Sequence, residues 1–560
     1  MKWYVGLSNT GHDPAISIVD PDGNVVFAEA TERFLQVKRA WGVPPDLAAH
    51  LKHAFNQTSF EPSRDQVEVC TSWASTQRAS GRALLHPLMG RNQLDAIADY
   101  QADLFDNHGA SFRLLDLANG PVELRRFEHH SCHTATAVHF SKAGDAVCLV
   151  IDGEGETGAV SQFTVAGRRI KRDWRSWNAG ASLGFFYRWL TVKCGFSDVL
   201  GEEWKVMGLA ACGQVREDLV EALSRTLTFN NHRPVLSDDD VVAEIDVQIQ
   251  HAVRGVGEPV MQAADLAASG QYVYSRFADE LVRGSMEKEP EALLLTGGCA
   301  LNSSYNGTIQ TRFGLPSVEI PPCPADDGNA IGAALLAWSV DHDAPIPPSD
   351  GSPYLGSAPD QHMIARFVRH AADHFDVAEL GSGSAGAVAQ RLSEGDIIGV
   401  MRGRAEFGPR ALGHRSILAD PRRADMKDRI NKLVKGREPY RPFAPVVPAH
   451  LVGEWFEDAN ESPYMSKTLK WRQDRQALVP SVVHADGTGR VQTVCAQQNA
   501  WLFDLVMAFA GQTGVPVVLN TSLNIMGKPI VHSVEDTIAV LMTTGLDAVL
   551  LEDYLIEKRS

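Results

Sequence analysis

The sequence predicts an α/β protein built from more than one domain. The chain has 560 residues, which is too many for a single hydrophobic core. Two strand–turn–strand patterns, at residues 3–19 and 146–165, alternate with segments of helical spacing such as 263–286. The region at 341–360 contains five prolines and few large apolar residues. It therefore predicts a boundary between a first and a second domain.

The two strand–turn–strand patterns follow the same order. In the first, apolar residues 3–8 lead into the turn Asn9-Thr10-Gly11-His12-Asp13 and then into an alternating strand at 15–19. In the second, a strand at 146–151 ends in a turn of glycines and acids, and another strand follows at 159–165. This repeat predicts an internally duplicated nucleotide-binding fold of the actin, Hsp70 and sugar-kinase type.

Charge, hydropathy and cysteine usage indicate which binding partners and which cellular compartment we expect for the protein. The formal net charge of −17 argues against binding of duplex nucleic acid by the overall field, although it allows a local basic pocket for a phosphorylated molecule. The start lacks a basic stretch followed by an apolar run, and no uncharged apolar window reaches about eighteen residues, so we expect neither a signal peptide nor a membrane span. The eight scattered cysteines form no C-x-x-C pair, which favours a cytoplasmic protein.

A group of histidines and aspartates predicts a metal site. His129 and His133 are four residues apart, so a helix would place both imidazoles on one face. Asp152 follows the strand at 146–151, and Asp326 lies in an acidic turn that opens a helix of small residues. Three or four nitrogen and oxygen ligands without a thiolate suit iron, manganese or zinc.

Several of these ligands have an alternative. His130 could replace His129, because a spacing of three residues to His133 also reaches one helix face. Asp327 competes with Asp326, and a carboxylate in this turn could instead cap the helix. The histidine pair could equally be a buried core pair beside an ordinary turn.

Glycines mark two places where the backbone could approach an anionic ligand. Gly153 and Gly155 follow the aspartate at the end of the strand, and such a turn can come close to a phosphate. Gly297 and Gly298 precede a helix and suit contact with the sugar and base of a nucleotide, although a glycine pair can also serve close packing alone.

Basic residues are concentrated between positions 402 and 441. A solvated basic face is one explanation for them. The glycines and prolines within residues 406–413 fit a shaped anion pocket better than an exposed helix. The basic residues are Arg402, Arg404, Arg410, Arg415, Arg422, Arg423, Lys427, Arg429, Lys432, Lys435, Arg437 and Arg441.

The order of these motifs resembles the large domain of the O-carbamoyltransferases that modify antibiotics and nodulation factors. That domain in turn resembles subunits of the tRNA threonylcarbamoyltransferase. The motifs are Gly-His-Asp at 11–13, His-His-x-x-His at 129–133, Asp-Gly-x-Gly at 152–155, Gly-Gly-x-x-x-Asn at 297–302 and Ala-Asp-Asp-Gly at 325–328, with further matches at 182–187 and 205–210.

The second region resembles the same family more specifically. Residues 404–413 resemble its arginine loop. Lys435-Gly436-Arg437, together with Ser522-Leu523-Asn524, resembles the K-x-R and S-x-N signature of YrdC-like domains. Residues 441–445, 490–493 and 519–522 complete the pattern, so the resemblance covers nearly the whole chain.

The resemblance implies two domains and a two-step reaction. Residues 1–345 would form an actin/Hsp70-like carbamoyl-transfer domain with the metal site, 346–360 a linker, and 361–560 a YrdC-like domain. In the second domain, carbamoyl phosphate and ATP, with Mg²⁺, would give a carbamoyl-adenylate and pyrophosphate. The carbamoyl group would then pass in the first domain to a hydroxyl of a small natural-product acceptor, with release of AMP.

The resemblance also implies a role for each matching residue. His129, His133, Asp152 and Asp326 would bind the metal, with Fe²⁺ favoured over Mn²⁺ or Zn²⁺. His12 would be the general base, and Arg410 and Lys435 would be catalytic in the second domain. Nucleotide contacts in the first domain would come from Gly153, Gly155, Lys205, Gly297, Gly298 and Asn302. Carbamoyl phosphate and ATP would bind Arg404, Arg410, Lys435, Arg437, Arg441, Arg490, Asn520, Ser522 and Asn524.

Other functions explain less of the sequence. A small-molecule kinase on the actin-like fold, which would make ADP, leaves the second region without a role. A nucleotide-gated, non-catalytic binding module of the Hsp70 sort does not need the histidine pair of a metal site. The hydrogenase-maturation carbamoyltransferase adds an acylphosphatase domain and zinc fingers, for which this chain has neither room nor cysteine pairs. The acceptor, O- or N-carbamoylation and a homodimeric state are left open. Residues 80–115, with His86, Met89, Asn92, Tyr100 and Phe105, predict either an acceptor-facing insert or a packed helical cap.

Overall fold

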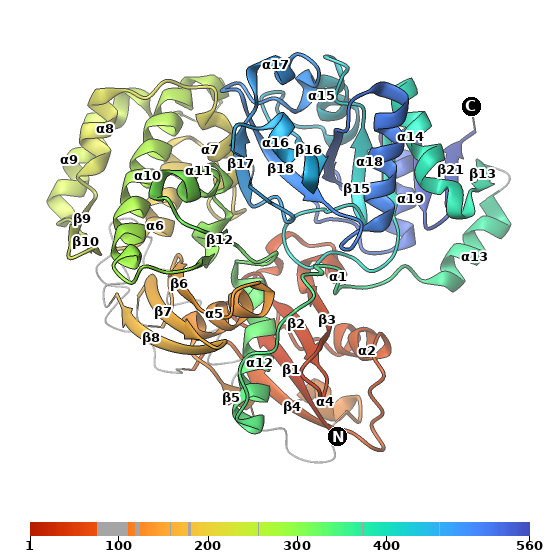
Figure 1. Ribbon diagram of the computed structural model, residues 1–560, viewed down its shortest axis with the longest axis horizontal. Helices are drawn as coiled ribbons and strands as arrows, with labels where there is room; N and C mark the ends of the chain where they lie inside the picture. Colours follow the sequence, from red (N-terminus) through yellow and green to blue (C-terminus); the bar gives the residue numbers. More distant parts are fainter. Residues whose placement is uncertain are drawn as a thin grey trace. The chain divides into compact units, whose positions relative to one another are not determined.

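The computed structural model describes most of the chain (Figure 1). The described residues are 1–74, 110–117, 124–156, 158–176, 181–255, 257–371, 374–458 and 460–559. The insert predicted at 80–115 therefore lies outside them, apart from its last six residues. The chain forms two compact units. The first comprises Met1–Thr31, Arg39–Asn302 and Ile309–Asp350, and the second comprises Glu32–Lys38, Ser303–Thr308 and Gly351–Ser560.

The first unit contains two five-stranded sheets of the same topology. One has the order β3-β2-β1-β4-β5, and the other has the order β8-β7-β6-β11-β12. In each sheet the first three strands in sequence are antiparallel neighbours, and the last two are added in parallel. The internal duplication predicted from the two strand–turn–strand patterns is thus present in the sheets. The strands are β1 (Lys2–Ser8), β2 (Ala15–Val19), β3 (Val25–Ala30), β4 (Gln66–Thr71), β5 (Leu124–Arg126), β6 (Ala146–Ile151), β7 (Val160–Ala166), β8 (Arg169–Arg175), β11 (Leu293–Thr296) and β12 (Val318–Glu319).

Two buried helices lie in close contact in the first unit. They are α5 (His129–Phe140) and α12 (Asn329–His342). A Cβ atom on Gly332 would lie 2.0 Å from the carbonyl oxygen of Cys132, so only glycine allows the two backbones to approach this closely. This crossing brings the start of α5 near the turn that precedes α12, where Asp326 lies.

Most of the remaining helices of the first unit follow the second hairpin in sequence. The helix expected at 263–286 is observed as α10 (Ala264–Met286). The others are α2 (Ala48–Asn56), α4 (Ala110–Leu114), α6 (Leu183–Lys193), α7 (Glu203–Ala210), α8 (Glu217–Ser224) and α9 (Asp239–Ile249), with the hairpin β9 (Leu227–Asn230) and β10 (Arg233–Leu236) between α8 and α9. A further helix, α11 (Ser303–Phe313), is divided between the two units. Among the described residues, no helix combines the length and apolarity needed to cross a bilayer.

The second unit is built on a nine-stranded mixed sheet. Its order is β13-β21-β20-β14-β15-β19-β16-β18-β17. Neighbouring residues Val446 and Val447 are buried in different hydrophobic clusters, so both faces of the sheet are covered. The strands are β13 (Phe375–Glu379), β14 (Ile398–Met401), β15 (Arg415–Ala419), β16 (Ala444–Pro448), β17 (Lys467–Lys470), β18 (Thr488–Val494), β19 (Val518–Ser522), β20 (Ala548–Leu551) and β21 (Tyr554–Lys558).

The helices of the second unit include a short one from the start of the chain. This is α1 (Thr31–Leu35), of which residues 32–35 belong to the unit. The longer ones are α13 (Gln361–His370), α14 (Ser384–Glu394), α18 (Ala500–Thr513) and α19 (Val534–Thr543), and a π-helix at Ile430–Lys435 ends at Lys435. The observed architecture is α/β with mixed sheets in both units, as the sequence predicts.

Candidate functional site

The start of α5 is fixed by two carboxylates. Glu128 precedes the helix and accepts a hydrogen bond from the backbone N–H of Ser131 at 2.8 Å. Glu156, from the turn after β6, accepts one from the backbone N–H of His129 at 3.0 Å. Negative charge is favourable at this end of a helix, where N–H groups lack partners within the helix. His129 and His133 therefore occupy defined positions one turn apart.

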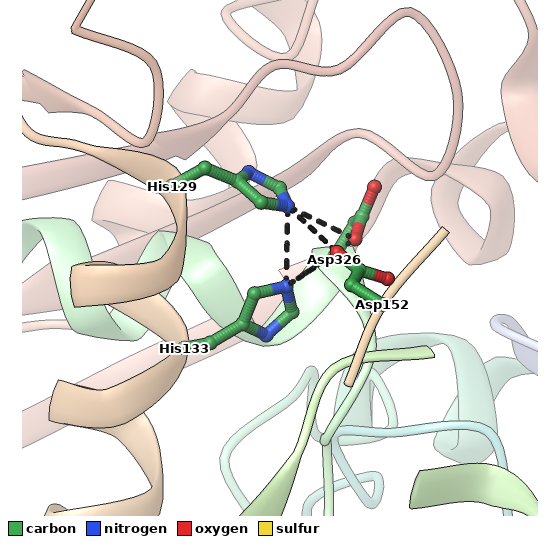
Figure 2. A group of neighbouring side chains, drawn as sticks. All are labelled: His129, His133, Asp152 and Asp326. Carbon is green, nitrogen blue, oxygen red and sulfur yellow. Dashed lines mark hydrogen bonds and ion pairs between the residues drawn. The ribbon is translucent and has the colours of Figure 1, made fainter. Parts of the chain in front are cut away.

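His129, His133, Asp152 and Asp326 form one cluster (Figure 2). One donor atom from each lies within 4.8 Å of all the others. The Nε2 atoms of His129 and His133 are 3.2 Å apart, and they lie 3.1 and 3.3 Å from Oδ2 of Asp152. Both are 3.5 Å from Oδ1 of Asp326. The structure thus brings together all four predicted metal ligands, although their binding of a metal stays a prediction.

The electrostatics of this cluster suit a divalent cation. Burial lowers the pKa of His129, but the two aspartates outweigh it and raise this pKa well above its ordinary value. Burial alone would raise the pKa of Asp152 and Asp326, yet the two imidazoles hold both below the usual range. Two imidazole nitrogens and two carboxylate oxygens, all largely buried, are a donor set that fits iron, manganese or zinc.

The two rival ligands lie outside the cluster. Nδ1 of His130 is 2.7 Å from Oγ of Ser161, and its buried Nε2 lacks a partner among the described residues. A Cβ on Gly155 would lie 2.7 Å from this Nε2, so His130 packs against the glycine turn. Asp327 accepts a hydrogen bond from the backbone N–H of Gly328 at 3.0 Å. Spacings of three and four residues both place a histidine on the same helix face as His133. The choice between His129 and His130 therefore depends on how each ring is oriented, which the sequence does not give.

His12 lies beside the cluster, in the turn after β1. Its Nδ1 is 2.9 Å from Oδ2 of Asp13 and 3.9 Å from Oδ2 of Asp326. Nη2 of Arg39 donates to the same Asp13 oxygen at 2.9 Å, and the ring of Trp41 lies 5.0 Å from the His12 ring. Sequence reasoning missed Arg39 and Trp41, because no local motif links residues 39–41 to the first turn.

The glycine turns contact the histidine–aspartate cluster through Asp152. Oδ1 of Asp152 accepts hydrogen bonds from the N–H groups of Gly153, at 2.8 Å, and Gly298, at 3.0 Å. Gly297 has φ of 88° and comes so near Ile151 that a side chain would clash with its carbonyl. Both predicted glycine motifs therefore meet at one carboxylate.

Two further predicted nucleotide contacts have protein partners. The Asn302 amide donates to Oε1 of Gln271 at 3.1 Å, and the Tyr187 hydroxyl donates to the same oxygen at 2.8 Å. Lys205 forms an ion pair with Glu202 at 2.7 Å. The roles of Asn302 and Lys205 toward a nucleotide stay predictions.

In the second unit, residues 404–413 form a tightly held loop, which we call the arginine loop. The buried carboxylate of Glu406 accepts hydrogen bonds from the N–H groups of Leu412 and His414 at 2.6 and 2.8 Å. Arg404 donates to the carbonyl of Gly356 at 2.9 Å. Asn520 donates to the carbonyl of Ala411 at 3.1 Å. Arg404 and Asn520, predicted as anion ligands, thus also support the backbone of this region.

Four arginines form a cation cluster with little compensating charge, namely Arg410, Arg437, Arg441 and Arg490. Arg410 and Arg490 are partly buried, and neither forms a hydrogen bond or ion pair with any of the described residues. Burial lowers the pKa of Arg410 to about 10. Burial, together with the other three arginines, lowers the pKa of Arg490 well below its usual value. Arg441 lies 3.6 Å from Glu438. Clusters of arginines with few acidic partners are typical of anion sites, and the binding of an anion here stays a prediction.

The K-x-R and S-x-N motifs meet beside this cluster. The ammonium of Lys435 donates to Oδ1 of Asn524 at 2.7 Å and also contacts the carbonyl and hydroxyl oxygens of Ser522. Burial and the neighbouring Arg437 and Arg441 lower the pKa of Lys435 well below its usual value. The two motifs, 87 residues apart between Lys435 and Ser522, therefore form one network.

Family models match both parts of the chain. The model described as carbamoyltransferase N-terminus matches residues 4–335, and the model described as carbamoyltransferase C-terminus matches residues 389–558. The nodulation protein NolNO of Sinorhizobium fredii is 32% identical over 99% of this chain and 80% of its own length. The 3'-hydroxymethylcephem-O-carbamoyltransferase of Amycolatopsis lactamdurans is 31% identical over 76% of this chain and 79% of its own length.

Similarity to solved structures is much weaker. The (R)-2-hydroxyglutaryl-CoA dehydratase component A of Acidaminococcus fermentans covers 61% of this chain with a TM-score of 0.34 and 13% identity. A likeness at this level supports no conclusion about fold or function. The two family models and these two relatives confirm the family predicted from the motifs. The chain belongs to the carbamoyltransferase family, and it is an enzyme that transfers a carbamoyl group to an acceptor.

Proposed function

We propose that the protein is an ATP-dependent O-carbamoyltransferase whose acceptor is a hydroxylated small molecule, of the natural-product kind. The duplicated sheets of residues 1–345 form an actin/Hsp70-type transfer domain, 346–360 is the linker, and 361–560 is a YrdC-like domain that makes the activated carbamoyl group. All eight cysteines lie in the described part of the chain and none forms a disulfide, which supports a cytoplasmic location.

The first step belongs to the second unit. Carbamoyl phosphate loses its phosphate to water, and an oxygen of the resulting carbamate attacks the α-phosphorus of Mg²⁺-bound ATP. The bond to pyrophosphate breaks, which leaves a carbamoyl-adenylate. Arg410 and Arg490 bind and neutralise the phosphate oxygens, while Lys435, held by Ser522 and Asn524, supplies a further hydrogen-bond donor. The uncompensated Arg410 and Arg490 are the observation that carries this proposal.

The second step belongs to the first unit. The acceptor hydroxyl oxygen attacks the carbamoyl carbon, and the bond to the AMP phosphate oxygen breaks. His12 takes the hydroxyl proton on Nε2, because its Nδ1 faces Asp13 at 2.9 Å. His129, His133, Asp152 and Asp326 would hold a divalent metal, with Fe²⁺ favoured, which would supply Lewis-acid stabilisation of negative charge. The adenylate lies beside the glycine turns, whose own N–H groups donate to Asp152 and to backbone carbonyls of the protein.

Product analysis tests this function. Purified protein is incubated with carbamoyl phosphate and Mg-ATP, in the presence of Fe²⁺, Mn²⁺ or Zn²⁺ in turn. We expect AMP and pyrophosphate, whereas a small-molecule kinase would make ADP. Absence of pyrophosphate with all three metals would refute the proposal.

Two variants separate the steps. Arg410→Met is expected to abolish pyrophosphate formation. His12→Asn is expected to retain pyrophosphate formation from carbamoyl phosphate and ATP while carbamoylated acceptor, measured by mass spectrometry on a panel of hydroxylated natural products, is lost. Loss of pyrophosphate formation in His12→Asn would contradict the assignment of the two steps to the two units.

A further inference from the structure

A buried arginine from the beginning of the chain binds the main chain of the arginine loop. Arg33 lies in α1 and is 4% exposed. Its Nη1 donates to the carbonyl of Glu406 at 2.5 Å, and its Nη2 donates to the carbonyl of Gly408 at 2.6 Å. The two terminal nitrogens of one guanidinium thus fix two carbonyls that are two residues apart, which the single nitrogen of a lysine cannot do in the same way.

Arg33 holds the part of the loop that precedes Arg410 in the sequence. After Arg410, the side-chain amide of Asn520 donates to the carbonyl of Ala411, and that of Gln492 donates to the carbonyl of Leu412 at 2.9 Å. Before Arg410, Arg33 donates to the carbonyl of Gly408, whose φ of 120° is a backbone conformation that favours glycine. Arg410 therefore lies in a short turn whose backbone is held on both sides.

Arg33 also acts on the charge of the loop. Burial alone would raise the pKa of Glu406, but His414, Arg33 and Arg415 outweigh it and hold this pKa below its ordinary value. Glu406 therefore stays ionised, and its carboxylate can accept the backbone N–H groups that fold the loop around it. Without Arg33, the carbonyls of Glu406 and Gly408 would lose their donor, and Glu406 would lose one of its nearby positive charges.

We propose that Arg33 is a positioning residue of the anion site: it holds the arginine loop so that Arg410 is preorganised for carbamoyl phosphate and ATP. This inference rests on the proposed function. Arg33 is buried and acts through its contacts with the loop. Although it falls within residues 4–335, which match the N-terminal family model, it serves the step assigned to the C-terminal region. Sequence position alone would assign it to the wrong step.

The test uses the full-length chain and inorganic pyrophosphate as the probe. The variants are Arg33→Lys, which keeps the charge, and Arg33→Met, which removes it. The matched control is Arg168→Met, because Arg168 likewise donates to backbone carbonyls, of His139 at 3.2 Å and Ile346 at 3.0 Å, but in the first unit. We measure the Kd for pyrophosphate by calorimetry, the KM for carbamoyl phosphate in pyrophosphate formation, and the Tm.

We expect Arg33→Met to raise both Kd and KM about tenfold or more at temperatures where the protein is folded, with Arg33→Lys in between. Arg168→Met is expected to lower the Tm and leave the Kd unchanged. A lower Tm with unchanged Kd and KM in Arg33→Met would show a merely structural role and overturn the inference. If Arg33→Met does not fold, Arg33→Lys decides in the same way. Wild-type protein that neither binds nor makes pyrophosphate would overturn the proposed function, and this inference with it.

Discussion

Arg490 allows the proposed anion site to be tested against the stability of the fold. Its partly buried guanidinium makes no hydrogen bond or ion pair within the described part of the chain, and its charged neighbours are Arg410, Arg437 and Arg441. Such a group costs free energy in the ligand-free protein and gains it when an anion binds. The substitution Arg490→Met keeps a side chain of similar length and removes the charge. It should therefore change stability and binding in opposite directions.

The two effects can be estimated separately. Relief of an unpaired, partly buried charge is expected to stabilise the ligand-free protein by about 1 kcal/mol, which corresponds to a rise in Tm of about 2–4 °C for a unit of this size. A charge-assisted hydrogen bond to a phosphate oxygen is worth about 1.5–3 kcal/mol. Its loss weakens pyrophosphate binding by a factor of about 10–150.

Thermal unfolding with and without pyrophosphate measures both quantities in one experiment. Wild-type protein is expected to show a large ligand-induced rise in Tm, because a ligand that binds only the folded state stabilises it. Arg490→Met should start at a higher Tm and show little further rise. Arg366→Met, which replaces an exposed arginine of α13, is the control and should match wild type. A variant that is less stable without ligand and still gains the full rise with it would refute the reasoning.

Three further predictions follow from the first unit. His129→Asn is expected to reduce bound metal at least tenfold after dialysis, as measured by elemental analysis, whereas His130→Asn keeps it; the reverse result would move the ligand to His130. Gly332→Ala is expected to destabilise the unit by about 1–3 kcal/mol in chemical unfolding, and to weaken metal binding, because it forces α5 and α12 apart; wild-type stability would contradict the close crossing. Burial lowers the pKa of His139 to about 4, whereas a histidine in the unfolded chain has a pKa near 6.5. Because the unfolded state therefore takes up the proton first, the free energy of unfolding decreases as the pH drops from about 6.5 to 4. His139→Asn should remove about 3 kcal/mol of that loss, measured by urea unfolding at both pH values, and an unchanged pH dependence would contradict it.

Local sequence rules were sufficient where the relevant geometry is local. His129 and His133 meet because one helical turn separates them, and the duplicated hairpins were visible as repeated strand and turn patterns. The anion pocket predicted from the basic residues at 402–441 stays a prediction, although Arg410, Arg437 and Arg441 of this stretch do lie near one another and near Arg490. For the histidine pair and the hairpins, spacing along the chain determines spacing in the structure.

The other features of the two sites depend on packing between segments that are distant in the sequence. Whether His129 or His130 faces Asp326 is decided by how α5 packs on α12 and on the glycine turn, and no spacing rule contains that information. The network of Lys435 with Ser522 and Asn524 was predicted only as a family signature, because its hydrogen bonds join separate elements. Arg33 was missed altogether, since its partner Glu406 is 373 residues away and an arginine in a short helix carries no motif.

The division of the chain into units has a consequence for its synthesis on the ribosome. Residues 32–38 and 303–308 belong to the unit whose main part begins at residue 351, so they leave the ribosome before their partners exist. At about 5–20 residues per second, the 373 residues between Arg33 and Glu406 take roughly 20–75 s to translate. During this interval the guanidinium of Arg33 has no carbonyls of the loop to bind. The last third of the chain must therefore be made before α1 reaches its final environment, and a nascent chain stalled before residue 406 should expose α1 to proteolysis.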